Sequence, residues 1–213
     1  IEHGEITALA LQPDGRVLIG GSFESITGVP RHHLARLQPE GGLDASFVPA
    51  PLEIGDDWYI TALGLQRDGR IVVAGHLVTD PSWSGYYGLT RLNPDGSLDT
   101  DFHARVAANG PVFALLIQPD DKIVFSGGFT HVNGVPNSGL ARLNADGSLD
   151  SSFNPPSTTY PDLLALAPDG KMFISDSHRT YRLNPDGNVD SRWQCDTPGG
   201  VTVLANGDVL FGG

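Results

Sequence analysis

The amino-acid sequence predicts an all-β fold, a β-propeller of four-stranded antiparallel blades. Two turn-centred motifs recur in the same order along the 213 residues, and no segment has sustained helical periodicity. Repeats of this kind are supersecondary units that bury their apolar surfaces against neighbouring copies, and a linear stack of hairpins is the alternative arrangement. We expect one propeller region, residues 1–213, which is a fragment of a larger propeller. Its blades are expected at about residues 5–49, 58–103, 111–154 and 162–194, with a partial blade at 199–213.

The first motif is a tight turn between two apolar runs. In the first copy the turn is Gln12-Pro13-Asp14-Gly15. Pro suits the second position of a type I turn, and Gly takes the left-handed conformation that closes a three-residue hairpin loop. The flanking runs, 8–11 and 17–21, are apolar on both faces. Because such strands are sandwiched between two layers, we expect the first motif to form the inner hairpin of each blade.

The second motif places an arginine opposite an aspartate. The turn Asn93-Pro94-Asp95-Gly96 sets Leu92 opposite Leu98 and therefore Arg91 opposite Asp99. These cross-strand pairs are structural, and each is worth about 0.2–1 kcal/mol if it is exposed to solvent. The same spacing of eight residues predicts four ion pairs: Arg36/Asp44, Arg91/Asp99, Arg142/Asp150 and Arg182/Asp190.

Composition excludes several functional classes. The formal net charge of −12 argues against binding to nucleic acid or to anionic membranes, which need a basic surface. No apolar run approaches the roughly 18 residues that membrane insertion requires. Cys195 is the single cysteine, so no internal disulfide is expected. The sequence has no phosphate-binding loop, nucleophile elbow or zinc signature, and we expect no cofactor and no metal site.

The paired motifs resemble the delta-60 repeat family. The resemblance rests on LALQPDGRVLIGGSF, a Gly-Val-Pro segment and ARLNADGSLDSSF, and it covers residues 6–193 and the half-repeat to 213. It implies a β-propeller in a large bacterial protein that is secreted or displayed at the cell surface. It implies little about activity, because one fold serves many functions. Several positions depart from the pattern: Arg67 and Ala145 each replace a usual proline, and Asp121 replaces a turn glycine.

An aromatic cluster is the best candidate binding site. The connection between the first two blades and the long loop inside the second blade belong to one blade edge, so their side chains could converge. Flat aromatic faces and carboxylates suit a sugar, whereas burial of the same rings in a blade junction is the alternative. The candidate ligand-binding residues are Asp56, Asp57, Trp58, Tyr59, Trp83, Tyr86 and Tyr87.

These features favour a non-catalytic binding or scaffold module that recognises a carbohydrate or protein partner through its loops. The alternative is a glycoside hydrolase with Glu5, Asp57 and Asp162 at the mouth of the channel, because each precedes an innermost strand. Exposed sheet edges invite pairing with other chains. We therefore expect the terminal blade edges to be capped by the rest of the parent chain or by a second subunit.

Overall fold

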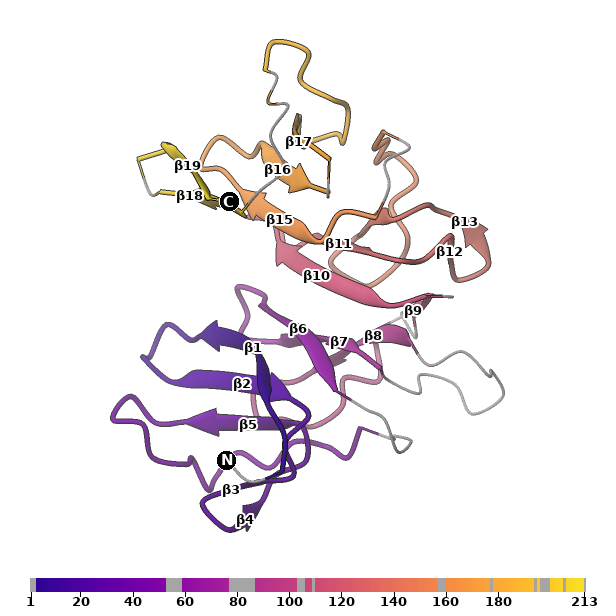
Figure 1. The fold of residues 1–213 in the computed structure, drawn as a ribbon. Coiled ribbons are helices and arrows are strands. Elements are labelled where there is room, and N and C mark those ends of the chain that lie inside the picture. Colours follow the sequence, from indigo (N-terminus) through magenta and orange to yellow (C-terminus); the bar gives the residue numbers. More distant parts are fainter. Residues whose placement is uncertain are drawn as a thin grey trace.

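A computed structural model describes residues 3–52, 59–76, 87–102, 106–108, 110–156, 160–176, 178–193, 195, 200–204 and 206–212. The described residues form antiparallel strands and turns without a helix, and the fold is an all-β propeller (Figure 1). Accordingly, this part of the chain has no helix of the length and apolar character that crossing a bilayer requires.

Each repeat builds a small sheet in which the first strand pairs with the second and the second with the third. The first sheet has the order β1 (Ile6–Leu11), β2 (Val17–Gly21) and β5 (Leu34–Leu37). The third repeat uses β10 (Val112–Ile117), β11 (Ile123–Gly127) and β14 (Leu140–Leu143). The fourth uses β15 (Leu163–Leu166), β16 (Met172–Ser175) and β17 (Thr180–Leu183), and the fifth has β18 (Gly200–Val203) and β19 (Val209–Gly212).

The second repeat forms a larger sheet because the third repeat adds to it. Its own strands are β6 (Ile60–Leu65), β7 (Ile71–Gly75), β8 (Tyr87–Leu92) and β9 (Val106–Ala108). A short hairpin, β12 (His131–Val132) and β13 (Val135–Pro136), joins the edge at β9. The first repeat has an equivalent hairpin, β3 (Ser25–Ile26) and β4 (Val29–Pro30). These hairpins lie at the ends of the sheets that we call the loop face, opposite the Asp-Gly turns.

The prediction of four-stranded blades is corrected in one respect. The expected fourth strand is reduced to a single bridge in each of the four repeats: Leu37–Leu43, Leu92–Leu98, Leu143–Leu149 and Leu183–Val189. The strand stops because the side chain of the next aspartate accepts a hydrogen bond from the backbone N–H two residues ahead. In the first repeat, Asp44 Oδ1 accepts from Ser46 N at 3.0 Å. Such local side-chain bonds compete with a sheet ladder.

The turns have the predicted conformation. In the first repeat Gln12 N donates to Arg16 O at 2.8 Å, and Gly15 has a φ of 83°. Asp121 stands at the equivalent position of the third repeat and keeps a left-handed φ of 64°. The strained position is therefore retained without glycine, at a residue type that tolerates it better than most.

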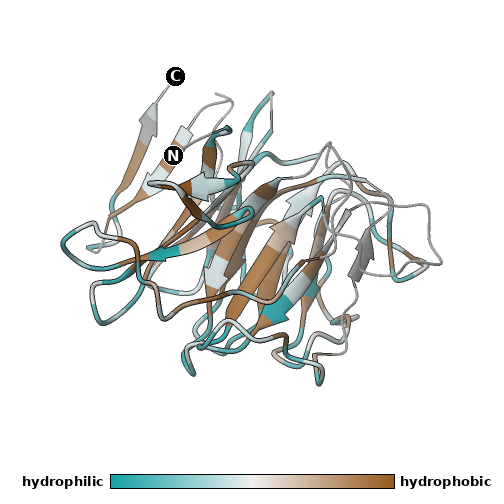
Figure 2. Cartoon of the chain, turned by 90° about the horizontal axis from the view of Figure 1, so that it is seen from below, coloured by the Kyte–Doolittle hydropathy of each residue, from teal (hydrophilic) through white to brown (hydrophobic). Residues whose placement is uncertain are grey.

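Most of the hydrophobic core lies between repeats, because three of its four clusters of buried side chains join neighbouring repeats and one lies within the first repeat. The first strands contact one another in the series β1, β6, β10, β15 and β18. One cluster of buried side chains joins Val72 and Leu89 of the second repeat to Ile123 and Phe125 of the third. Apolar residues accordingly run along neighbouring sheets, while the turns are polar (Figure 2). Each repeat thus completes its core with a neighbour, as the repeat pattern predicts.

Candidate functional site

The predicted aromatic cluster falls largely outside the described residues. Tyr87 begins β8, and only its backbone is described. Tyr59 is 40% exposed, and its ring stacks on His76 with centroids 5.5 Å apart. The predicted members that lie outside the described residues are Asp56, Asp57, Trp58, Trp83 and Tyr86.

The structure brings the four arginine–aspartate pairs together. In each repeat the arginine lies on the third strand and the aspartate follows the bridge, so the turn sets them opposite each other. The closest N–O distances are 2.8 Å for Arg36/Asp44, 2.8 Å for Arg91/Asp99, 2.9 Å for Arg142/Asp150 and 2.8 Å for Arg182/Asp190.

Sequence reasoning missed two further members of this cluster. Each aspartate also binds a cation from the inner hairpin, and each arginine lies over an aromatic ring. The cations are Arg16, Arg70, Lys122 and Lys171, and the rings are those of Phe47, Phe102, Phe153 and Trp193. A detectable signal existed: a basic residue recurs two positions after each inner-turn aspartate, and an aromatic residue recurs three positions after each paired aspartate.

Hydrogen bonds favour the ionised form of three of the paired aspartates, Asp44, Asp150 and Asp190. Ser46 Oγ donates to Asp44 Oδ1 at 2.6 Å, and with Arg36 it lowers the pKa of Asp44 to about 2. Burial would raise the pKa of Asp150, but hydrogen bonds from Ser152 and Lys122 outweigh burial and hold the pKa below its ordinary value. The Arg192 backbone N–H lowers the pKa of Asp190 in the same way. These three carboxylates are therefore anions of the frame near neutral pH.

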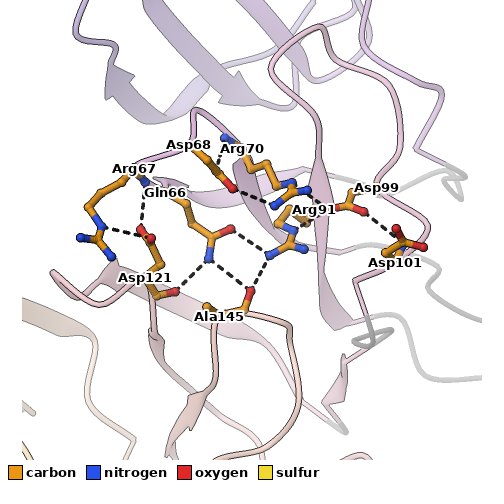
Figure 3. A network of polar contacts seen from close by, with 9 residues as sticks. All are labelled: Gln66, Arg67, Asp68, Arg70, Arg91, Asp99, Asp101, Asp121 and Ala145. Atoms are coloured by element: carbon orange, nitrogen blue, oxygen red, sulfur yellow. Dashed lines mark hydrogen bonds and ion pairs between the residues drawn. The ribbon is translucent and has the colours of Figure 1, made fainter.

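A polar network joins the second repeat to the third (Figure 3). Arg91 Nη1 donates to the carbonyl of Ala145 and, at 3.0 Å, to Gln66 Oε1. Gln66 Nε2 donates in turn to the carbonyl of Asp121 at 2.8 Å. The buried polar side chains of one repeat therefore end on the backbone turns of the next.

Two of the departures from the repeat pattern, Arg67 and Asp121, bind each other in this network. Arg67 N donates to Asp121 Oδ1 at 2.8 Å, and Arg67 Nε donates to Oδ2 at 3.1 Å (Figure 3). A proline at position 67 would lack the backbone donor, and a glycine at position 121 would lack the acceptor. The two replacements thus add one contact between repeats.

A pocket opens beside the β12–β13 hairpin at the edge of the third repeat, with a volume of about 330 Å³. Val135 and Pro136 form one wall, and Phe153, Pro155 and Pro156 form part of the other. Asn137, Ser138 and Asn154 supply amide and hydroxyl groups. The lining is about as polar as it is apolar and includes the Asp150 carboxylate, and the volume lies at the lower end of the range of ligand pockets.

The predicted catalytic carboxylates are not brought into a described site. Glu5 and Asp162 are exposed residues before β1 and β15, and Asp57 lies outside the described residues. The backbone N–H of Glu5 donates to Ser22 Oγ at 3.0 Å, and the backbone N–H of Asp162 donates to the carbonyl of Ser175 at 3.1 Å. Within the described ranges, no three His, Cys, Asp or Glu side chains are grouped for metal binding.

Comparison with family models gives one match. The model described as a domain of unknown function (DUF5122) β-propeller matches residues 12–47, 66–102 and 118–153, which together make up about half of the chain. The chain belongs to this family. Each DUF5122 match runs from an inner turn to the aromatic residue that follows the paired aspartate, so it contains the complete ion-pair cluster of its repeat. No curated protein matches the chain.

Solved structures share the fold of this DUF5122 protein. A gluconolactonase from Xanthomonas campestris is 17% identical with a TM-score of 0.61, and the match covers 96% of this chain and 68% of the gluconolactonase. A protein of unknown function from Bacteroides caccae is 14% identical with a TM-score of 0.58, over 98% of this chain and 70% of that one. A glucose dehydrogenase is 15% identical with a TM-score of 0.54, over 87% and 62%. At these identities the likeness concerns the fold alone.

Proposed function

We propose that this protein is a non-catalytic binding module whose loop face recognises a carbohydrate or protein partner. The observation that supports this proposal is that the buried charged side chains bind one another or the backbone of the repeats. Every buried charged side chain in the described part of the chain is bonded within the repeat frame. These residues are Asp44, Arg91, Asp99, Arg142, Asp150, Asp176 and Asp190. A rigid frame of this kind suits the display of binding loops.

The pocket beside β12–β13 supplies the chemistry of recognition. Its proline and valine walls offer flat apolar surfaces to a pyranose ring or an extended peptide. Asn137 and Asn154 offer both donors and acceptors to hydroxyl or backbone groups. The predicted aromatic cluster, Tyr59 with Trp58 and Trp83, belongs to the same proposal as a second contact region.

Binding to a glycan array tests the carbohydrate part of the proposal. Val135→Glu should abolish binding, because it places a charge at the mouth of the pocket. Val29→Glu is the matched control, because Val29 occupies the same position of the β3–β4 hairpin and is also exposed, 39% against 48% for Val135. Trp83→Ala tests the aromatic cluster separately. Equal binding by both valine variants would contradict a role for the pocket, and no glycan binding by the natural protein would contradict the carbohydrate reading.

The catalytic alternative is a hydrolase of glycosides or of sugar lactones. It is favoured by the predicted carboxylates Glu5, Asp57 and Asp162 and by the gluconolactonase among the solved neighbours. Hydrolysis of aryl glycosides or aldonolactones that is lost in Asp57→Asn and Asp162→Asn would support it. Unchanged turnover in these variants would assign the activity to a contaminant or to another site.

The origin of the protein is part of the same proposal. The motifs resemble those of the delta-60 repeat family, and we place the parent protein outside a bacterial cell or on its surface for that reason. Detection of the native protein in the culture medium or at the cell surface would support this location, whereas its recovery only from cytosol would contradict it.

A further inference from the structure

Each outer turn of the second, third and fourth repeats is held by an arginine of the repeat before it. In every case the arginine uses Nε for its own aspartate and Nη1 for a backbone carbonyl of the next repeat. The donors and acceptors are Arg36 and Pro94 at 3.1 Å, Arg91 and Ala145, and Arg142 and Pro185.

An aromatic ring completes this contact, and in the first repeat a backbone N–H adds a further bond. A Cβ atom at Gly96 would lie 3.0 Å from Phe47 Cε2, and one at Gly187 would lie 2.8 Å from Phe153 Cε2. The backbone N–H of Ala50 donates to Gly96 O at 2.8 Å. We call the arginine and the ring the turn socket. It admits a turn that has glycine in the left-handed position, because a side chain there would strike the ring.

The fourth repeat also has an arginine over an aromatic ring, Arg182 over Trp193. This turn socket differs from the three filled sockets, which each hold the outer turn of the next repeat. Arg182 places both Nε and Nη2 on Asp190, at 3.1 and 2.8 Å. Its guanidinium lies 5.8 Å from the centroid of the Trp193 ring, whereas the filled sockets have 4.4–4.5 Å. The Arg182 side chain is 24% exposed, against 6% for Arg91 and Arg142. Among the described residues, no carbonyl accepts from Arg182 Nη1.

We propose that the turn socket formed by Arg182 and Trp193 is a docking site for an outer β-hairpin with an Asx-Pro/Ala-Asp-Gly turn, the hairpin that completes a fifth blade. Continuity with the three filled sockets identifies this occupant. The described part of the fifth repeat consists of β18 and β19, and β18 lies against β15. An outer hairpin paired with β19 brings its turn carbonyl to Arg182 and its glycine to Trp193. The guanidinium then exchanges its second contact with Asp190 for that carbonyl.

Extending the chain tests this proposal. Gly213 corresponds to Gly127 of the third repeat, because Val209 after the fifth turn corresponds to Ile123. Residues 128–156 are therefore appended after Gly213 as a second copy of that outer hairpin. The extended protein should unfold at a midpoint at least about 4 °C higher. Arg182→Gln should remove most of this increase, while it changes the midpoint of the chain without the extension by much less.

A second variant leaves the original 213 residues unchanged. Gly147→Val is introduced only in the appended copy, where its side chain would strike the Trp193 ring. This variant should also lose most of the increase. A midpoint that does not rise on extension, or a rise that survives both Arg182→Gln and the appended Gly147→Val, would overturn the proposal.

Discussion

Arg91 Nε lies 2.8 Å from Asp99 Oδ2, and both side chains are only 6% exposed. The same arginine reaches the carbonyl of Ala145 in the next repeat and lies over the Phe102 ring, 4.4 Å from its centroid. One side chain therefore closes its own outer hairpin and fixes the position of its neighbour. This double role makes the pair part of the joint between repeats.

Removal of a buried arginine of this set should be strongly destabilising. Arg142→Ala leaves Asp150 buried and takes the donor from the carbonyl of Pro185, so we expect a loss of about 3–5 kcal/mol in the free energy of unfolding in urea. Arg182→Ala is the matched control at the same repeat position, with a more exposed side chain and no described contact to a following turn. It should cost clearly less. Equal losses would contradict the role of the contact between repeats.

Stability should fall at acidic pH. The folded-state pKa of Asp44 is lowered to about 2, and those of Asp150 and Asp190 are also lowered. A lowered carboxyl pKa contributes stability above the unfolded value of about 3.9, and this contribution is lost as pH falls through the folded value. The thermal midpoint should therefore drop between about pH 5 and pH 2. Asp44→Asn should lower the midpoint at neutral pH and make that drop shallower; an unchanged profile would contradict the assignment.

The cost in stability of replacing a strand glycine by alanine should depend on which atoms surround the glycine. A Cβ atom at Gly64 would lie 2.5 Å from Leu115 Cδ1, the end of a side chain that can move. A Cβ at Gly127 would meet the carbonyl oxygen of Pro111, which belongs to the backbone. We expect Gly64→Ala to cost about 1–3 kcal/mol and Gly127→Ala to cost more, measured by urea unfolding. The reverse order would be inconsistent with the packing of the inner hairpins.

The contact between Arg67 and Asp121 should show energetic coupling. Arg67→Pro and Asp121→Gly each restore the common repeat residue and break the contact. In a double-mutant cycle, we expect the double variant to be more stable than the sum of the single losses predicts, by about 0.5–1.5 kcal/mol. Additive losses would show that the two replacements are independent.

Much of this frame could be predicted from the sequence because its physics is local. The turn chemistry at Pro94-Asp95-Gly96 determines the register, and the register places Arg91 opposite Asp99. The contact of Arg91 with Ala145 could not be predicted, because the carbonyl comes from another repeat and any residue type provides one. The predicted length of the fourth strand was wrong because Asp44 binds the backbone N–H of Ser46 as well as the side chain of Arg36.

The candidate binding site could be predicted less well. The pocket beside β12–β13 is lined by proline, valine, serine and asparagine, which carry no recognisable motif in the sequence. Their arrangement depends on how the hairpin meets the segment after Asp150. The flat aromatic side chains of Trp58 and Trp83 are of a kind that suits sugar binding, and their convergence stays a prediction.

The most direct test of the central claim is the behaviour of one repeat in isolation. Residues 106–156 contain the third repeat, whose buried side chains share a cluster with Val72 and Leu89 of the second. If repeats complete their cores only with neighbours, the amide proton spectrum of this fragment should show the narrow dispersion of an unfolded chain, while the full protein shows dispersed signals. A fragment that folds cooperatively with dispersed signals would contradict the account.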